Sequence, residues 1–276
     1  MCDTCGCNLT PGNEHLVADG ARLAGTSSET ESVEVLKGLL DANDHQATHN
    51  REHFDQHRVF VINLMSSPGA GKTSLLEATI DALASDLGIA VIEGDLETEN
   101  DAVRIREKGV PAIQICTGSA CHLDAHLVHT ALHEMTIEGL DILFIENVGN
   151  LVCPASFDLG QHRNVTLLSS PEGDDKPAKY PVMFRMTDLI LLTKSDLIDV
   201  LGDFDPARAT SYIRLLANPA PVLPVSARSG QGVEAWCDWL LEQVSLHRRQ
   251  IAHEDTTLSN AQPDSEGLHT HAMEGR

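Results

Sequence analysis

The residues best suited to do chemistry are those of SSPGAGKTS, residues 66–74, which follow the apolar run 59–65 and precede an amphipathic stretch. A strand, a glycine-rich loop, Lys-Ser/Thr and a helix, in this order, are typical of a phosphate-binding loop. Ser66 stands where the usual pattern has its first glycine. At this position the chain only exits the strand, so the substitution should not disturb the loop. We expect this loop to form a cradle for the phosphates, and we expect Thr73 to be a ligand of Mg²⁺ as well. The residues assigned to the nucleotide are Gly69, Ala70, Gly71, Lys72, Thr73 and Ser74. An ordinary glycine-rich turn is the alternative.

Two later segments indicate which base the nucleotide carries. TKSD, Thr193–Asp196, ends an apolar run, and a carboxylate there accepts hydrogen bonds from the N1–H and N2 amino groups of guanine. SARSGQG begins at Ser226 after another apolar run and is typical of the loop that closes over guanine O6. Together they favour GTP, with Lys194, Asp196, Ser226 and Ala227 around the base. Two ordinary strand-to-helix loops are the alternative.

Two acidic residues at the ends of other apolar runs complete the predicted catalytic group. EGDLET places Asp95 where it can hold Mg²⁺ directly or through water, and ENVGN places Glu146 and Gly149 where the γ-phosphate is sensed. We expect Lys72, Asp95 and Glu146 to be catalytic and the Gly149 amide to be the switch. Solvated loop carboxylates are the alternative for both acids.

Cysteines at the extreme N-terminus have the spacing of metal ligands. MCDTCGC supplies the thiolates of Cys2, Cys5 and Cys7, and removal of Met1 would make the α-amine of Cys2 a fourth ligand. A planar N/S set suits Ni²⁺, and a tetrahedral zinc site needs the same thiolates. The odd total of seven cysteines favours metal binding over a disulfide framework. A zinc knuckle and a redox Cys-x-x-Cys pair remain open.

A second set of soft ligands lies inside the main domain. TGSACHLDAH places Cys121 and His122 near the start of a helix, and Cys153 lies four residues after the predicted switch glycine. Both loops leave the C-terminal edge of the predicted sheet, so the three side chains could converge beside the γ-phosphate and couple metal affinity to nucleotide state. The alternative is two small buried cysteines and a surface histidine. Cys116 and Cys237 fit core packing.

Histidines recur at helical spacing in two places. A stripe that drifts slowly along one helix contains His45, His49, His53 and His57. A second group, which falls within about 60° on a helix, contains His122, His126, His129 and His133. We hypothesise that the second group is a relay leading metal towards Cys121. A solvated polar face is the alternative for both.

The order of apolar and amphipathic segments predicts the fold class. From residue 59 onward, apolar runs alternate mostly with amphipathic stretches, which indicates an α/β P-loop NTPase with a mostly parallel central sheet flanked by helices. The runs are VFVINLM, IAVIEGD, VPAIQICTG, DILFIENVG, NVTLLSS, DLILLTKSD and PVLPVSA. The predicted organisation is a cysteine motif at 1–8, a flexible linker at 9–29, a helical segment at 30–56, a GTPase domain at 57–253 and a disordered acidic tail at 254–276.

Composition excludes some partners. The net charge of −22, from 41 acidic and 19 basic residues, opposes binding to nucleic acid or to an anionic membrane. No apolar stretch approaches the ~20 residues needed to span a bilayer, and the N-terminus lacks the basic and apolar regions of a signal peptide. We expect a cytoplasmic protein with one main domain.

These motifs together resemble the HypB-type hydrogenase/urease nickel-incorporation GTPases, a P-loop metallochaperone family. The resemblance covers residues 1–7 and about 57–250, through MCDTCGC, SSPGAGKTS, EGDLETENDAVRIREKGVPAIQICTGSACHLDA, ENVGNLVCPASFDLG and EGDDKPAKYP. It implies a nickel site at the N-terminal cysteines and a second Ni²⁺ or Zn²⁺ site at Cys121, His122 and Cys153. It also implies a homodimer in the GTP-bound state. The implied partners are a small zinc-containing nickel chaperone and the precursor of the [NiFe] hydrogenase large subunit. The long histidine-rich tract that family members often carry after the first cysteines is missing here.

The predicted function is a slow, Mg²⁺-dependent conversion of GTP to GDP and phosphate, coupled to the binding of nickel and its insertion into apo [NiFe] hydrogenase. Two other functions are open. One is a nickel or zinc storage or sensing module with a regulatory nucleotide site, against which the intact Lys72 and Thr73 count. The other is a P-loop small-molecule kinase, against which TKSD and the lack of an acceptor-pocket or lid signature count.

Overall fold

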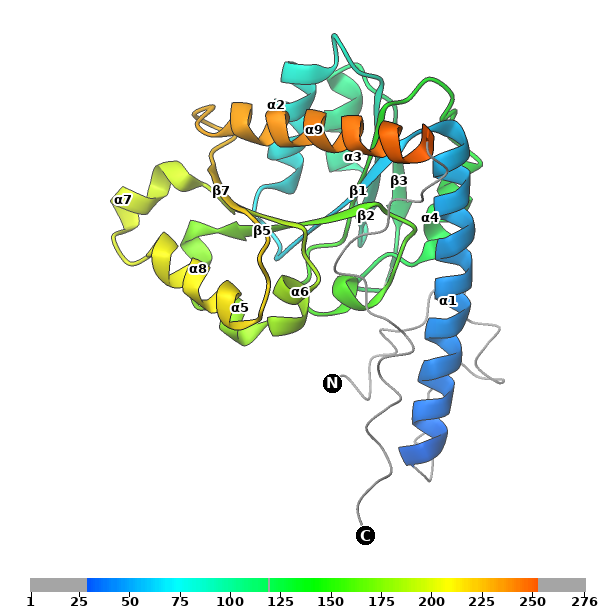
Figure 1. Ribbon diagram of the computed structural model, residues 1–276, viewed down its shortest axis with the longest axis horizontal. Helices are drawn as coiled ribbons and strands as arrows, with labels where there is room; N and C mark the ends of the chain where they lie inside the picture. Colours follow the sequence, from blue (N-terminus) through cyan, green and yellow to red (C-terminus); the bar gives the residue numbers. More distant parts are fainter. Residues whose placement is uncertain (1–28, 119, 253–276) are drawn as a thin grey trace.

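The computed structural model describes residues 29–118 and 120–252 (Figure 1). The predicted metal ligands Cys2, Cys5 and Cys7, the linker before residue 29 and the acidic tail lie outside the described residues. Within the described ranges, no helix is both long and apolar enough to cross a membrane.

A sheet of seven parallel strands forms the centre of the fold, in the order β3-β2-β4-β1-β5-β6-β7. Each strand comes from one of the seven apolar runs, and nearly continuous burial is what a parallel sheet covered on both faces requires. The strands are β1 Phe60–Ser66, β2 Ile89–Asp95, β3 Ala112–Cys116, β4 Ile142–Glu146, β5 Arg163–Ser169, β6 Leu189–Thr193 and β7 Val222–Val225. The predicted α/β fold with a parallel sheet is confirmed.

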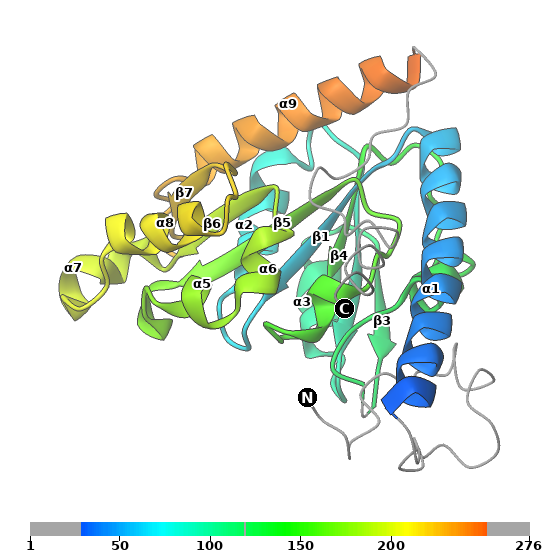
Figure 2. The same ribbon diagram turned by 60° about the horizontal axis from the view of Figure 1, so that its bottom comes forward.

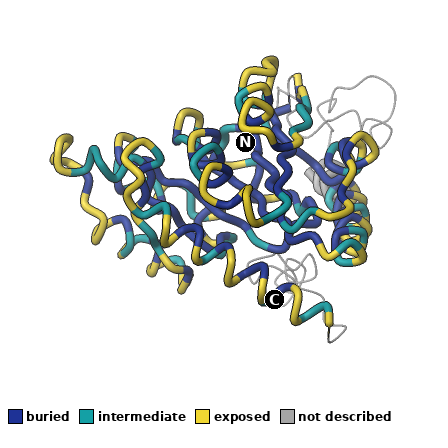
Figure 3. The backbone as a smooth tube through the Cα atoms, turned by 90° about the horizontal axis from the view of Figure 1, so that it is seen from above, coloured by how far each residue is buried: buried dark blue, intermediate teal, exposed yellow. Residues whose placement is uncertain are grey.

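Helices cover both faces of this sheet, and Figure 2 shows α9 and α1 on different sides of it. The helices are α1 Glu29–His57, α2 Lys72–Leu83, α3 Asn100–Glu107, α4 Ala125–Leu132, α5 Lys176–Lys179, α6 Pro181–Arg185, α7 Ile198–Leu201, α8 Pro206–Leu215 and α9 Val233–Ala252. Three short 3-10 turns are η2 Cys153–Ser156, η3 Ser170–Glu172 and η4 Ser195–Leu197. Helices α2, α3 and α9 pack on one face, whereas α1, α4, α6 and α8 pack on the other. In Figure 3 the inner strands are buried, whereas the edge strands β3 and β7 are mostly half-buried and most exposed residues lie on helices and loops.

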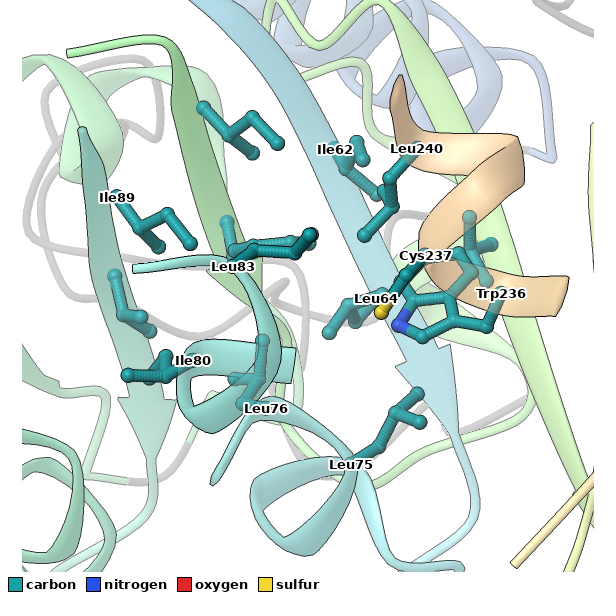
Figure 4. Packing of buried hydrophobic residues seen from close by; sticks show 14 of the residues in the cluster. Ile62, Leu64, Leu75, Leu76, Ile80, Leu83, Ile89, Trp236, Cys237 and Leu240 are labelled. Carbon is teal, nitrogen blue, oxygen red and sulfur yellow. The ribbon is translucent and has the colours of Figure 1, made fainter. Parts of the chain in front are cut away.

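Helix α9 closes the first face through Trp236. Its side chain is fully buried, and the indole N–H donates to Thr79 Oγ1 on α2 at 2.8 Å. Figure 4 shows Trp236 and its neighbour Cys237 against Leu64 of β1. Cys237 is therefore a core residue, as predicted. The same prediction for Cys116 is wrong, because β3 is an edge strand and leaves this thiol exposed.

Polar side chains fasten α1 to the second face. Asn43 Oδ1 accepts a hydrogen bond from the Ala125 N–H at 2.9 Å, and Asn50 Nδ2 donates to the Ala125 carbonyl at 2.8 Å. Gly160, with a φ of 91°, approaches the same helix so closely that a Cβ would lie 2.7 Å from the Ala47 carbonyl oxygen. Helix α1 is thus packed into the domain and holds the first residue of α4 in place.

A buried polar cluster joins α1, α9 and the start of β5 at the end of the sheet opposite the glycine-rich loop. Asp55 Oδ1 accepts hydrogen bonds from Nε2 of His162 and of His247, each at 3.0 Å. The Val61 N–H donates to His162 Nδ1 at 2.9 Å, so the proton of the neutral ring lies on Nε2. Burial raises the pKa of Asp55, but the two imidazole hydrogen bonds outweigh it and hold this pKa at about 2. The cluster is a carboxylate between two N–H donors, and His162 Nε2 has no lone pair for a metal ion.

Replacing His162 by glutamine is expected to make the protein less sensitive to acid. Burial lowers the pKa of His162 to about 4, whereas the unfolded chain has the ordinary value of 6.5. The folded pKa is depressed, so below pH 6.5 the unfolded state binds a proton that the folded state does not, and stability falls with pH. For one such group the loss between pH 7 and pH 5 is about 2 kcal/mol.

Urea unfolding at these two pH values measures the effect. The wild-type free energy of unfolding should fall by about 2 kcal/mol more than that of His162→Gln. Asp55, His247 and the nearby Arg51 are present in both proteins, and Asp55 titrates with an ordinary pKa of 3.8 or below it, so it adds little between pH 7 and pH 5. Equal losses in the two proteins would contradict the expectation.

Candidate nucleotide and metal sites

The loop between β1 and α2 has the shape of a phosphate cradle. Gly69 and Gly71 have φ angles of 73° and 97°, in the left-handed region that favours glycine. Helix α2 begins at Lys72, so its free N-terminal amides face the loop. Lys72 Nζ donates to Ser66 Oγ at 3.2 Å. The serine that departs from the usual glycine therefore contacts the lysine and does not obstruct the cradle.

Two carboxyl groups lie beside the start of α2. Thr73 Oγ1 donates to Glu146 Oε1 at 3.0 Å, and Lys72 Nζ lies 3.8 Å from the same oxygen. The strand register pairs Glu93 of β2 with Glu146, and both are buried. Burial and the neighbouring Glu146 raise the pKa of Glu93 to about 11, and burial raises the pKa of Glu146 although Lys72 opposes this. Glu93 is therefore protonated and donates to Glu146.

This group of acids has the donor atoms of a magnesium site. Carboxylate oxygens of Glu93, Asp101 and Glu146 all lie within 4.8 Å of one another. The Oε2 atoms of Glu93 and Glu146 are buried without a hydrogen-bond partner. The carboxylates of Asp101 and Glu146 and the Thr73 hydroxyl are hard oxygen donors of the kind that Mg²⁺ prefers, and the protonated Glu93 lies beside them. The motifs did not reveal Glu93, although an acid inside the apolar run 89–95 was a signal.

Asp95 lies outside this group of acids. Its carboxylate accepts hydrogen bonds from the Leu96 N–H at 2.7 Å and from the Thr98 hydroxyl at 2.6 Å. Burial tends to raise the pKa of Asp95, but these bonds lower it overall. The role of Asp95 as a magnesium ligand and catalytic residue stays a prediction.

The predicted guanine site lies at the ends of the neighbouring strands β6 and β7. Lys194 has a φ of 54°, and its Nζ donates to the Gly69 carbonyl at 2.8 Å, which ties TKSD to the cradle. Ser226 Oγ accepts from the Ser229 N–H at 3.2 Å and shapes the second loop. The loops at these two strand ends contain Lys194, Asp196, Ser226 and Ala227.

Cys121, His122 and Cys153 converge from the loop before α4 and from η2. The two Sγ atoms lie 3.1 Å apart, and His122 Nδ1 lies 3.9 Å from Cys121 Sγ. The His122 ring is fully buried and stacks on Phe157, with the centroids 4.0 Å apart. Burial lowers the pKa of His122 to about 4, so the imidazole is neutral at pH 7. Two half-buried thiols and a neutral imidazole form a soft donor set suited to Ni²⁺ or Zn²⁺.

One short loop contacts both the phosphate cradle and this donor set. Gly149 packs so closely on the cradle that a Cβ would lie 2.8 Å from Pro68 Cα. The next residue, Asn150, donates through Nδ2 to the Cys121 carbonyl at 3.3 Å. Asn150 was not among the predicted site residues, and its only signal was an amide beside the predicted switch glycine. Two consecutive residues of this segment therefore contact the phosphate cradle and the backbone of a metal ligand.

The predicted histidine stripe is wrong at its first member. Helix α4 begins at Ala125 because Asp124 caps it, with its Oδ1 accepting from the Leu127 N–H at 2.8 Å. His122 therefore precedes the helix and is buried. The remaining members of the stripe are exposed or half-buried: His126, His129 and His133.

Comparisons with known proteins agree with this geometry. Residues 60–223 match the family model described as CobW/HypB/UreG, nucleotide-binding domain. The hydrogenase maturation factor HypB of Rhizobium leguminosarum bv. viciae is 51% identical over 233 residues, which are 84% of this chain and 76% of that protein.

Two solved structures extend the match. The crystal structure of HypB from Helicobacter pylori in complex with nickel has a TM-score of 0.71 and 42% identity, and covers 74% of this chain and 95% of that chain. HypB from Archaeoglobus fulgidus has a TM-score of 0.69 and 37% identity, and covers 74% and 100%. The chain therefore belongs to the CobW/HypB/UreG family and, within it, to the HypB proteins that its motifs resemble.

Proposed function

We propose that this protein is a GTP-hydrolysing metallochaperone that binds nickel and inserts it into apo [NiFe] hydrogenase during maturation. The observation that carries the proposal is the shared loop, in which Gly149 packs on the cradle and Asn150 holds the segment of Cys121. A change at the terminal phosphate would reach the metal ligands through two neighbouring residues. The nickel complex of the Helicobacter pylori protein and the maturation role of the Rhizobium protein support the proposal.

Hydrolysis needs a water molecule in line with the bond to the leaving oxygen and positive charge around the transferred group. Lys72 would exchange its contact with Ser66 for the phosphate oxygens. Thr73 and Glu146 would hold Mg²⁺, which neutralises charge on the β- and γ-phosphates when bound. The protonated Glu93 keeps Glu146 in place by donating to it. The Gly149 amide would contact the γ-phosphate. Loss of this phosphate after hydrolysis would release the loop that contains Gly149.

The partners follow from the same proposal. The protein would act in the cytoplasm as a homodimer when GTP is bound, and would exchange nickel with a small zinc-containing nickel chaperone and the hydrogenase large-subunit precursor. Val152 is 58% exposed beside Cys153, which gives the metal loop an apolar surface for contact. The thiolates of the N-terminal motif would be the first nickel site, and the internal site would take Ni²⁺ or Zn²⁺.

A nickel titration of the full-length protein tests the proposal. Ni²⁺ is added in the presence of GDP, of a non-hydrolysable GTP analogue and of the matching ATP analogue. Thiolate-to-nickel charge-transfer absorbance reports binding, and light scattering reports mass. We expect the GTP analogue alone to change the nickel affinity and to produce a dimer. Equal affinity and equal mass with all three nucleotides would refute the coupling, and equal effects of both analogues would refute the guanine preference.

A further inference from the structure

Two helices that are far apart in sequence bring histidines together on the surface, where α1 lies beside α4 (Figures 1 and 2). The rings of His49 on α1 and His129 on α4 meet edge to face, with centroids 5.2 Å apart. His133 follows the last turn of α4, and its ring centroid lies 4.7 Å from that of His129. We call His49, His129 and His133 the α1–α4 histidine cluster. The sequence placed its members in two unrelated stripes, and only the fold joins them.

Two members of this cluster, His129 and His133, have ring nitrogens at the separation of metal ligands. His129 Nε2 and His133 Nε2 are 3.2 Å apart. Two nitrogens bound to one ion at 2.0–2.1 Å lie about 2.9–3.4 Å apart in octahedral or tetrahedral geometry. Histidines at i and i+4 on one helix are a recurring way to bring two imidazoles to one ion. The pair is therefore arranged as a chelate before any ion binds.

Protonation and access also favour a metal ion. Burial and the adjacent histidines lower the pKa of His129, which favours the neutral imidazole that a metal ion needs. The neighbouring His53 has a pKa lowered for the same reasons, although Glu138 opposes this. His49 and His133 are exposed, so an ion can reach the cluster from solvent, and His49, whose ring already contacts that of His129, would be the third ligand.

We propose that the α1–α4 histidine cluster is a further metal site, which binds a late divalent transition-metal ion of the Ni²⁺ or Zn²⁺ class through imidazole nitrogens alone. The site goes beyond the proposed function, because it needs neither the nucleotide nor any cysteine. At 1.5 Å per residue, His133 lies about 12 Å along the axis from the start of α4, so this ion is distinct from one at Cys121. It would hold metal near the thiolates without competing for them.

Equilibrium dialysis of the full-length protein against Ni²⁺, with excess Mg²⁺ to fill carboxylate sites, tests the proposal. The double variant His129→Gln/His133→Gln is expected to lose one equivalent of bound Ni²⁺ with no change in thiolate-to-nickel absorbance. His49→Gln should weaken the same equivalent by about tenfold. The matched control is His45→Gln/His126→Gln, which removes two exposed histidines from the same two helices and should keep every equivalent.

Each outcome decides the proposal. A double variant that binds as much Ni²⁺ as the wild type, with the same affinities, overturns it. So does an equal loss in the control, which would show only scattered binding to surface imidazoles. Circular dichroism and thermal melting establish that the variants are folded. Failure of the proposed function is separately visible, because it removes the nucleotide effect on the thiolate absorbance and leaves the imidazole equivalent in place.

Discussion

Replacing Lys72 by alanine is expected to lower the rate of GTP hydrolysis about a hundredfold to a thousandfold. The side chain is buried and donates to Ser66 Oγ at 3.2 Å, so its ammonium group lies inside the cradle, where we expect the terminal phosphates to bind. Removal of one preorganised donor to the transition state costs about 10²–10³ in rate. Phosphate release at saturating GTP and Mg²⁺ measures the effect.

The variant should fold, because Glu146 does not become an unpaired buried charge. Burial already raises the pKa of this carboxyl group, and the loss of Lys72, which lowers it, further favours the protonated form. A matched control is Lys108→Ala, which removes a lysine whose Nζ pairs with Asp81 at 2.5 Å on the surface and should keep the wild-type rate. Retention of more than half of the wild-type rate by Lys72→Ala would show that phosphate transfer does not occur in this cradle.

The sheet and the phosphate cradle could be predicted because neighbouring residues determine them. Each apolar run is long enough for one strand, and burial on both faces leaves it almost no polar positions. Gly69 and Gly71 have the positive φ angles that the loop requires, and these angles are what the glycine spacing indicates. Such features need no knowledge of distant segments.

Contacts between distant segments could not be predicted in the same way. A polar residue in a helical pattern is expected on the surface, yet Asn43 and Asn50 are buried because both bond to the backbone of Ala125. Asn147 similarly accepts from the Leu123 N–H at 3.1 Å and fixes the loop before α4. Partners of this kind appear only once the chain is folded, and they position the internal cysteines.

Strand order and helix ends account for the two wrong placements. Cys116 lies in an apolar run that resembles those of the buried strands. Its exposure follows from the position of β3 at the sheet edge. His122 fits the helical period of α4, but Asp124 caps the helix, which begins at Ala125, and the imidazole stacks on Phe157 instead. The helical placement of His122 belonged to the relay hypothesis. The role of His122 as a metal ligand stays a prediction.

The second large effect is expected at the internal cysteines. In a full-length protein whose Cys2, Cys5 and Cys7 are serine, Cys121 and Cys153 are the only thiols of the described residues that lie in a group of metal-binding side chains. Cys153→Ser in this background should weaken Ni²⁺ binding there by about a hundredfold or more, since loss of a group that only supports a ligand already costs about 10–100-fold. A serine hydroxyl stays protonated at pH 7 and is a poor partner for a soft site.

The reason lies in how the two sulfur atoms are held. Cys153 comes from η2 and reaches 3.1 Å from Cys121 Sγ, so its loss leaves only Cys121 and the buried His122 of the three donors. Thiolate-to-nickel absorbance during competition with a chromophoric chelator gives the affinity. Cys116→Ser is the matched control, because it removes an exposed thiol from edge strand β3 and should leave the affinity unchanged. If both variants bind Ni²⁺ equally well, the approach of the two sulfurs has no part in metal binding, whatever the result for Lys72.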